Sequence, residues 1–206
     1  MEFCCEDVLV VGAHPDDFEI MAGGVLARSK REGSKTYAIV CTDGALGGEP
    51  EMRRSETEAA ARVLEIDELV FLDFPDGGMV RDHRTIHRME EVIREMQPDI
   101  IITHSMNDTH QDHVHTCEAV LSAGRRHSRV LLGETPSSRT PLAPGPVFDI
   151  SDYFETKIEA LACHASQLVG SGGPLDLEVF RTVAGYHGLQ IHTRFAEAFE
   201  IWRFGI

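Results

Sequence analysis

Apolar residues along this chain fall into two alternating patterns. Short continuous apolar runs, such as 8–11 and 100–102, are typical of strands buried on both faces. Between these runs, apolar residues recur three or four positions apart, as in 18–26 and 86–96, which is typical of amphipathic helices. The predicted strands are 7–12, 36–42, 68–73, 99–103, 129–133, 147–150 and 196–202. The predicted helices are 15–31, 50–65, 82–96, 112–125, 152–166 and 175–186.

The alternation of strands and helices predicts the α/β class. We expect a Rossmann-like three-layer sandwich, with a mostly parallel sheet covered by helices on both faces. No linker or repeat divides the chain, and the proline-rich stretch 136–146 is short enough to be a loop, so 1–206 is expected to be a single domain. Ligands of such sheets bind beyond the carboxyl ends of the strands.

Composition and charge exclude several classes of binding partner and indicate where the protein is located. The formal net charge of −15 argues against nonspecific binding to nucleic acid or to anionic membranes. No run approaches the roughly 20 apolar residues of a membrane span, and the first residues lack the basic and apolar regions of a signal peptide. The five cysteines, which include Cys4 and Cys5, show no paired spacing and are interpreted as reduced thiols. These features predict a cytoplasmic protein.

The segment 12–17, Gly-Ala-His-Pro-Asp-Asp, delivers a histidine and two adjacent carboxylates to the start of a predicted helix. Pro15 suits the first helical position, and acids suit a first turn, so helix-start chemistry explains part of the segment. It leaves His14 unexplained, and adjacent carboxylates repel unless a cation lies beside them. The turn also lacks the glycines of a dinucleotide-binding fold, and its acids would repel a pyrophosphate. The segment therefore indicates a metal site.

A histidine cluster follows the fourth predicted strand, with four histidines within 104–115. His110 and His113 open a predicted helix, whereas helix geometry turns His115 away, so that we expect it on the surface. His104 has two open interpretations, a site residue or simply the end of a strand. Two histidines and a carboxylate at a zinc ion leave one position for water, as in catalytic sites. That set is supplied by His14, Asp17 and His113.

With Ala-His-Pro-Asp-Asp at 13–17 and His-Gln-Asp-His at 110–113, the chain resembles the PIG-L/LmbE family of zinc-dependent N-acetyl-sugar deacetylases. Weaker matches extend over nearly the whole chain. They are the glycine-rich stretch 43–48, Arg53 with Glu56, Pro-Asp-Gly-Gly at 75–78, Lys157 with His-Ala-Ser-Gln at 164–167, and Ala-Glu-Ala-Phe at 196–199. The sequence departs at Phe195, where the family often carries tyrosine. Tyr186 is the substitute that the sequence offers.

The resemblance implies a hydrolase that removes an N-acetyl group from an N-acetylglucosamine-type sugar or sugar conjugate. Zn²⁺ would be bound by His14, Asp17 and His113, and a zinc-activated water would attack the amide carbonyl with Asp16 as general base.

The resemblance also assigns roles around this centre. His110 would stabilise the oxyanion and act as general acid, and Asp112 would orient His110 and keep it protonated. Arg53 would contact the sugar or its anomeric substituent. Relatives of this kind commonly assemble into homo-oligomers, which the resemblance extends to this chain.

Three alternatives remain open at the level of sequence. One is an amidase that cleaves a larger acyl group from a sugar conjugate. Another is a non-catalytic sugar- or metal-binding module, against which Asp16 and His110 argue, because binding zinc requires neither. The third is a two-metal phosphoester hydrolase, whose additional carboxylate ligands would be Asp43, Asp73 and Asp76.

Overall fold

The computed structural model describes residues 6–138 and 145–205, and confirms the α/β class. A seven-stranded sheet has the order β3-β2-β1-β4-β5-β7-β6. The strands are β1 Val8–Gly12, β2 Thr36–Thr42, β3 Glu68–Phe74, β4 Ile100–His104, β5 Arg129–Gly133, β6 Val147–Asp149 and β7 Ala196–Phe204. The helices are α1 Asp17–Arg31, α2 Pro50–Val63, α3 His83–Met96, α4 Gln111–Ala123, α5 Phe154–Ala162 and α6 Leu177–Gln190, with 3₁₀ turns η1 Ala165–Gln167 and η2 Val169–Ser171.

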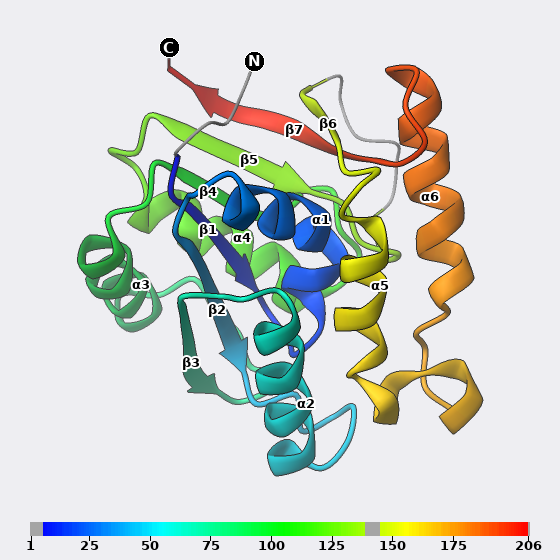
Figure 1. Ribbon diagram of the computed structural model, residues 1–206. Coiled ribbons are helices and arrows are strands. Elements are labelled where there is room, and N and C mark those ends of the chain that lie inside the picture. The colour runs from blue at the N-terminus through cyan, green and yellow to red at the C-terminus, as the bar shows by residue number, and fades with distance from the viewer. Residues whose placement is uncertain (1–5, 139–144, 206) are drawn as a thin grey trace.

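Helices cover both faces of the sheet, as the apolar runs predict (Figure 1). Val8, Val10 and their neighbours pack against α1, α2, α5 and α6, whereas Leu9, Val11 and their neighbours pack against α3 and α4. Successive strand side chains point to opposite faces, so a strand buried on both faces needs an unbroken apolar run. Within the described part of the chain, no helix has the length and apolarity to cross a membrane.

The sheet reverses its winding between β1 and β4. β1 pairs in parallel with β2 on one side and with β4 on the other, whereas β7 runs antiparallel to both β5 and β6. The carboxyl ends of β1 and β4 therefore meet at a topological switch point, where open α/β sheets leave a crevice for ligands. The segments that follow these two strands carry the histidines and acids singled out in the sequence.

The start of the first helix differs from the prediction. α1 begins at Asp17 rather than at Pro15, and Asp16 takes a left-handed conformation with φ 102°. The Asp17 carboxylate accepts a 2.6 Å hydrogen bond from the backbone N–H of His14. This local bond folds 14–17 into a turn, so the chain cannot adopt helical dihedrals as early as Pro15. The predicted helix 152–166 is likewise shorter, ending at Ala162 before η1.

A buried ion pair interrupts α1. Ala22 leaves the helical region with φ −146°, and the Lys157 ammonium donates to the freed carbonyl of Ile20 at 2.8 Å. The Glu197 carboxylate lies 2.6 Å from the Lys157 ammonium and accepts the backbone N–H groups of residues 24 and 25. The pair thus replaces helical hydrogen bonds on both sides of the kink. Lys157 and Glu197, two of the residues that resemble the family, therefore have a structural role.

Candidate active site

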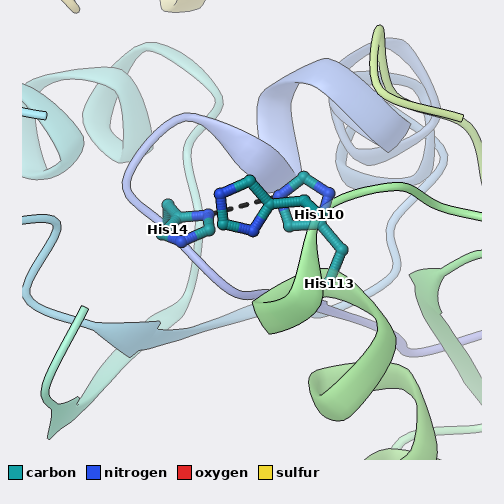
Figure 2. A group of neighbouring side chains, drawn as sticks. All are labelled: His14, His110 and His113. Atoms are coloured by element: carbon teal, nitrogen blue, oxygen red, sulfur yellow. Dashed lines mark hydrogen bonds between the residues drawn. The ribbon is translucent and has the colours of Figure 1, made fainter. Parts of the chain in front are cut away.

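Three side chains from two distant segments meet at the switch point. His14 Nδ1 lies 3.2 Å from His113 Nε2 and 3.3 Å from an Asp17 carboxylate oxygen. The other Asp17 oxygen lies 3.5 Å from His113 Nε2. Figure 2 shows the rings of His14 and His113 turned toward one another, with the ring of His110 beside them. The structure therefore brings together the three residues predicted as metal ligands.

The spacing and chemistry of these donors fit a divalent metal ion. A tetrahedral zinc ion with ligand bonds of about 2.0–2.1 Å separates its donor atoms by about 3.3 Å. The separations of 3.2 Å between His14 and His113 and of 3.3 Å between His14 and Asp17 lie close to that edge length, and the second Asp17 oxygen lies 3.5 Å from His113. Imidazole nitrogen and carboxylate oxygen are also ligands that zinc accepts. Combinations of His14, His110 and His113, and of Asp17, His104 and His113, also bring donor atoms within 4.8 Å of one another.

The charges around the site favour a cation. Burial alone would lower the pKa of His14, but hydrogen bonds to Asp112, Asp17 and Asp76 outweigh it and raise that pKa to about 12. Burial would likewise raise the pKa of Asp17, yet the imidazoles of His113 and His104 hold it well below its usual range. The carboxylates of Asp17, Asp76 and Asp112 thus surround His14, and a proton or a metal ion can neutralise their charge.

Asp16 lies beside the proposed ligands but is held by an arginine. Burial, and then the charge of Asp17, raise the pKa of Asp16 to about 7, while Arg53 opposes the rise. The Arg53 guanidinium lies 3.1 Å from the Asp16 carboxylate, donates to the carbonyls of Pro15 at 2.6 Å and Gly44 at 3.2 Å, and is buried. A carboxylate that titrates near neutral pH suits a general base. The contacts of Arg53 differ from the expected contact with sugar, because its donors face the protein.

The glycine-rich stretch after β2 makes room for this guanidinium. A Cβ atom at Gly47 would lie 2.5 Å from an Arg53 Nη atom, and one at Gly44, which has φ 68°, would lie 2.7 Å away. Side chains at these positions would therefore displace the guanidinium that holds Asp16.

We expect Gly47→Ala to lower kcat by about tenfold or more, because the methyl group pushes the Arg53 guanidinium away from Asp16 and loss of a hydrogen bond to a charged group costs about 1.5–3 kcal/mol. The matched control is Gly185→Ala in α6, where a Cβ atom meets nothing within 4 Å. Steady-state kinetics with equal metal content checks the prediction, and equal kcat values for the two variants would contradict it.

His110 is held differently from the prediction. Its Nδ1 accepts the backbone N–H of Asp112 at 3.3 Å, so the proton of the neutral ring lies on Nε2. The Asp112 carboxylate instead contacts His14 Nε2 at 3.3 Å and accepts the backbone N–H groups of Gly77 and Met79. Burial, followed by the charges of His14 and His113, lowers the pKa of His110. The expected carboxylate–imidazolium pair is therefore absent among the described contacts, and His110 offers an exposed ring with a neutral N–H donor.

The other two histidines of the cluster have structural contacts. His104 Nε2 accepts the backbone N–H of Ala13 at 2.9 Å, and its ring stacks on that of His113 with centroids 4.0 Å apart. His104 thus both ends β4 and supports the site. His115, expected on the surface, is half-buried, because its Nδ1 contacts the Met79 carbonyl at 2.5 Å.

Sequence reasoning missed a second layer of polar contacts. His164 pairs with Glu19 at 2.9 Å, Ser166 donates to Glu56, and Gln167 donates to the Gly47 carbonyl. Through these hydrogen bonds, residues 164–167 connect the loop after α5 to α1, α2 and the glycine-rich stretch. Asp108 was also missed, although it stands two residues before His110 in the cluster.

The carboxylates considered for a second metal are dispersed. Asp76 lies 3.2 Å from His14 Nε2 and, with Asp112 and His14, forms another group of converging donors. Asp43 accepts backbone N–H groups of its own loop and of residue 76, and Asp73 pairs with Arg54 at the surface. Only one of the three acids therefore reaches the histidines through a described contact.

One cavity lies away from these ligands. It has a volume of about 530 Å³ between α6, β7 and the end of β5, and Glu134, Pro136 and Tyr186 are part of its lining.

Phe195 is buried and stacks on Phe154, so the position where the family often has tyrosine belongs to the core here. Tyr186 is exposed on α6. Of the stretch 134–146, expected to border the acceptor side, 139–144 lie outside the described residues.

Fold and site together define an α/β protein with a histidine–aspartate centre able to hold a divalent metal at its switch point. Residues 9–124 match the model of the PIG-L family, described as GlcNAc-PI de-N-acetylase. The chain belongs to this PIG-L family, as the two sequence motifs predict.

Relatives and solved structures cover most of the chain. The uncharacterized deacetylase YaiS of Escherichia coli is 33% identical, over 77% of this chain and 90% of its own length. Diacetylchitobiose deacetylase of Thermococcus kodakarensis is 29% identical, over 92% of this chain and 80% of its own length. The crystal structure of the conserved protein TT1542 of Thermus thermophilus has a TM-score of 0.88 at 28% identity and covers 98% of this chain and 96% of that one.

Not every relative carries a deacetylase name. 4-Oxalmesaconate hydratase of Pseudomonas putida is 27% identical, over 79% of this chain and 74% of its own length. Family membership therefore leaves the reaction to be argued from the site.

Proposed function

We propose that this protein is a zinc-dependent hydrolase that removes the N-acetyl group from an N-acetylglucosamine-type sugar or sugar conjugate, releasing acetate and a free amine. The observation that carries the proposal is the meeting of donor atoms from His14, Asp17 and His113 at 3.2–3.5 Å from one another, with Asp16 next to Asp17 in the chain and held by Arg53. The deacetylase names of two relatives support the same reaction.

The chain's own residues divide the proposed work between them. Zn²⁺ would be held by His14, Asp17 and His113, and when bound such an ion acidifies water and polarises a carbonyl oxygen. Asp16, whose pKa is raised toward neutrality by burial, accepts the proton of the attacking water and returns it to the amine nitrogen as the C–N bond breaks. His110 Nε2–H donates to the carbonyl oxygen as negative charge develops there.

Two further residues position this machinery. Arg53 fixes the Asp16 carboxylate and opposes the rise of its pKa, so its proposed part in binding the sugar is secondary to this contact. Asp112 hydrogen-bonds His14 and, through its backbone N–H, sets the tautomer of His110.

The charges of the site favour an acetamido sugar over the substrate class of the hydratase. A hydratase substrate with several carboxylates needs cationic partners. In this site the carboxylates of Asp76 and Asp112 lie beside His14. The Arg53 guanidinium is already hydrogen-bonded to Asp16 and to backbone carbonyls. A neutral acetamide avoids this repulsion.

The substrate is tested by a panel with the zinc-loaded protein. N-acetylglucosamine, diacetylchitobiose and glucosamine with longer acyl groups are compared by release of acid and of free amine. Acetate release that exceeds release of longer acids supports the deacetylase, and preference for longer acyl groups supports the amidase. No release from any member, with stoichiometric zinc bound, would favour a binding module.

We also propose the setting in which the enzyme works. The 1–206 chain acts as a single domain in the cytoplasm, consistent with the free thiols of Cys41, Cys117 and Cys163, and it assembles into a homo-oligomer as is common among PIG-L relatives. Light scattering of the purified chain tests the assembly.

Metal removal separates ligands from catalytic donors. We expect a chelator to abolish activity and added Zn²⁺ to restore it. His113→Ala should lose stoichiometric zinc, because two protein ligands remain, whereas His110→Ala should keep zinc and lose about 100- to 1,000-fold in kcat, as for removal of an oxyanion donor. Elemental analysis after gel filtration, with kinetics, measures both. Retained zinc in His113→Ala would contradict the ligand assignment.

A further inference from the structure

One carboxylate outside the proposed catalytic set joins His110 and His113, at the start of α4, to the end of β5. Asp108 accepts hydrogen bonds from His113 Nδ1 at 3.0 Å and from the Thr135 hydroxyl at 2.7 Å through one oxygen. Its other oxygen accepts the backbone N–H of His110 at 2.8 Å and the Ser137 hydroxyl at 2.6 Å. Asp108 is buried, so these four donors define its orientation.

The contact with His113 uses the ring nitrogen that does not face the proposed metal. Nε2 points toward His14 and Asp17, and Nδ1 points toward Asp108. A carboxylate on the far nitrogen of a histidine fixes its tautomer and ring orientation and makes the near nitrogen a stronger ligand. Because Nδ1 donates its proton to Asp108, the lone pair of Nε2 is free for a metal.

Asp108 is itself rigidly held. Thr135 and Ser137 lie just after β5, the parallel neighbour of β4, and their hydroxyls reach across to the loop before α4. The Asp108 and Ser138 backbones also form an isolated antiparallel bridge. The sheet therefore sets the position of Asp108, and Asp108 sets the position of the histidines.

We propose that Asp108 is a positioning residue for the metal centre. It orients His113 for metal binding through Nδ1 and holds the backbone of His110 through its second oxygen, with Thr135 and Ser137 anchoring it to β5. The inference rests on the proposed role of His113 as a metal ligand, but metal binding tests it without any substrate.

The experiment measures zinc affinity by competition with a chelator of known affinity, using the whole chain and Zn²⁺ alone. We expect Asp108→Ala to weaken zinc binding by about 10- to 100-fold, as removal of such outer carboxylates does. Asp108→Asn, which keeps one acceptor oxygen but no charge, should fall between Asp108→Ala and wild type. Thr135→Val should weaken binding less than Asp108→Ala, since it removes a single anchoring bond.

The matched control is Asp82→Ala, which removes a carboxylate that accepts the backbone N–H of Thr85 at the start of α3. It should leave zinc affinity unchanged, which separates loss of a helix-start acid from loss of the contact with His113. If Asp108→Ala does not fold, judged by thermal melting, the Asn and Val variants carry the test. Unchanged zinc affinity in every folded variant would overturn the inference.

Failure of the positioning role of Asp108 can be distinguished from failure of the proposed deacetylase function. A zinc-binding wild type that releases no acid from any panel member refutes the deacetylase, while a weakened Asp108→Ala still supports the positioning role. Deacetylation by wild type with normal zinc affinity in the Asp108 variants refutes the positioning role alone.

Discussion

Asp16→Asn is expected to bind zinc like the wild type and to lose about 100- to 10,000-fold in kcat, the usual contribution of a general base. The amide keeps the shape of the side chain but cannot accept the proton of the attacking water. The contact with Arg53 weakens as well, because a charged pair becomes a neutral one. Steady-state kinetics on the best sugar of the panel, with zinc content measured on the same samples, gives the comparison.

The neighbouring pair on α2 supplies the matched control. Arg53 contacts Asp16 inside the site, whereas Arg54 contacts Asp73, which is exposed at the end of β3. Asp73→Asn should leave kcat and zinc content unchanged. A loss of activity in Asp73→Asn equal to that in Asp16→Asn would instead favour the two-metal alternative.

The same residue predicts an acidic limit to activity in the wild type. Burial, then the charge of Asp17, raise the pKa of Asp16, so the base takes up a proton as the pH falls. A bound divalent cation favours the ionised carboxylate and moves this limit to lower pH. We therefore expect kcat/KM to decline as the pH falls below neutrality and the decline to be missing from the residual activity of Asp16→Asn.

Of the substitutions discussed, Glu197→Ala is expected to lower the free energy of unfolding the most, by about 3–5 kcal/mol. It leaves the Lys157 ammonium buried without its counter-charge and deprives the N–H groups of residues 24 and 25 of their acceptor. Urea denaturation followed by circular dichroism measures the change. Lys157→Met should cost less, because the two N–H groups still bind Glu197.

The comparison pair is Arg181 with Glu155, which joins α6 to α5 at the surface. Exposed pairs are screened by water, so Glu155→Ala should leave the urea midpoint unchanged. Equal midpoints for Glu155→Ala and Glu197→Ala would mean that the pair at the kink of α1 contributes no more than a surface contact.

The sequence by itself determined the class of fold and the edge of the sheet at which the site lies. Unbroken apolar runs such as 8–11 specify strands buried on both faces, because side chains alternate between the two sides. Parallel strands place their carboxyl ends at one edge of the sheet, so the polar residues that follow them were expected at that edge. The strand order of the folded sheet then set β1 beside β4 and brought His14, Asp17 and His113 together.

Only the tertiary structure decided which partner each polar side chain has. Arg53 turned inward to Asp16, and the Asp112 carboxylate turned to His14 rather than to His110, because burial makes each group bind the acceptors or donors within reach. Such partners lie far apart in the chain, as Asp108 and Thr135 do, and no local pattern records them. Periodicity reports the environment of a backbone segment, whereas hydrogen-bond partners depend on atomic positions that exist only after the layers pack.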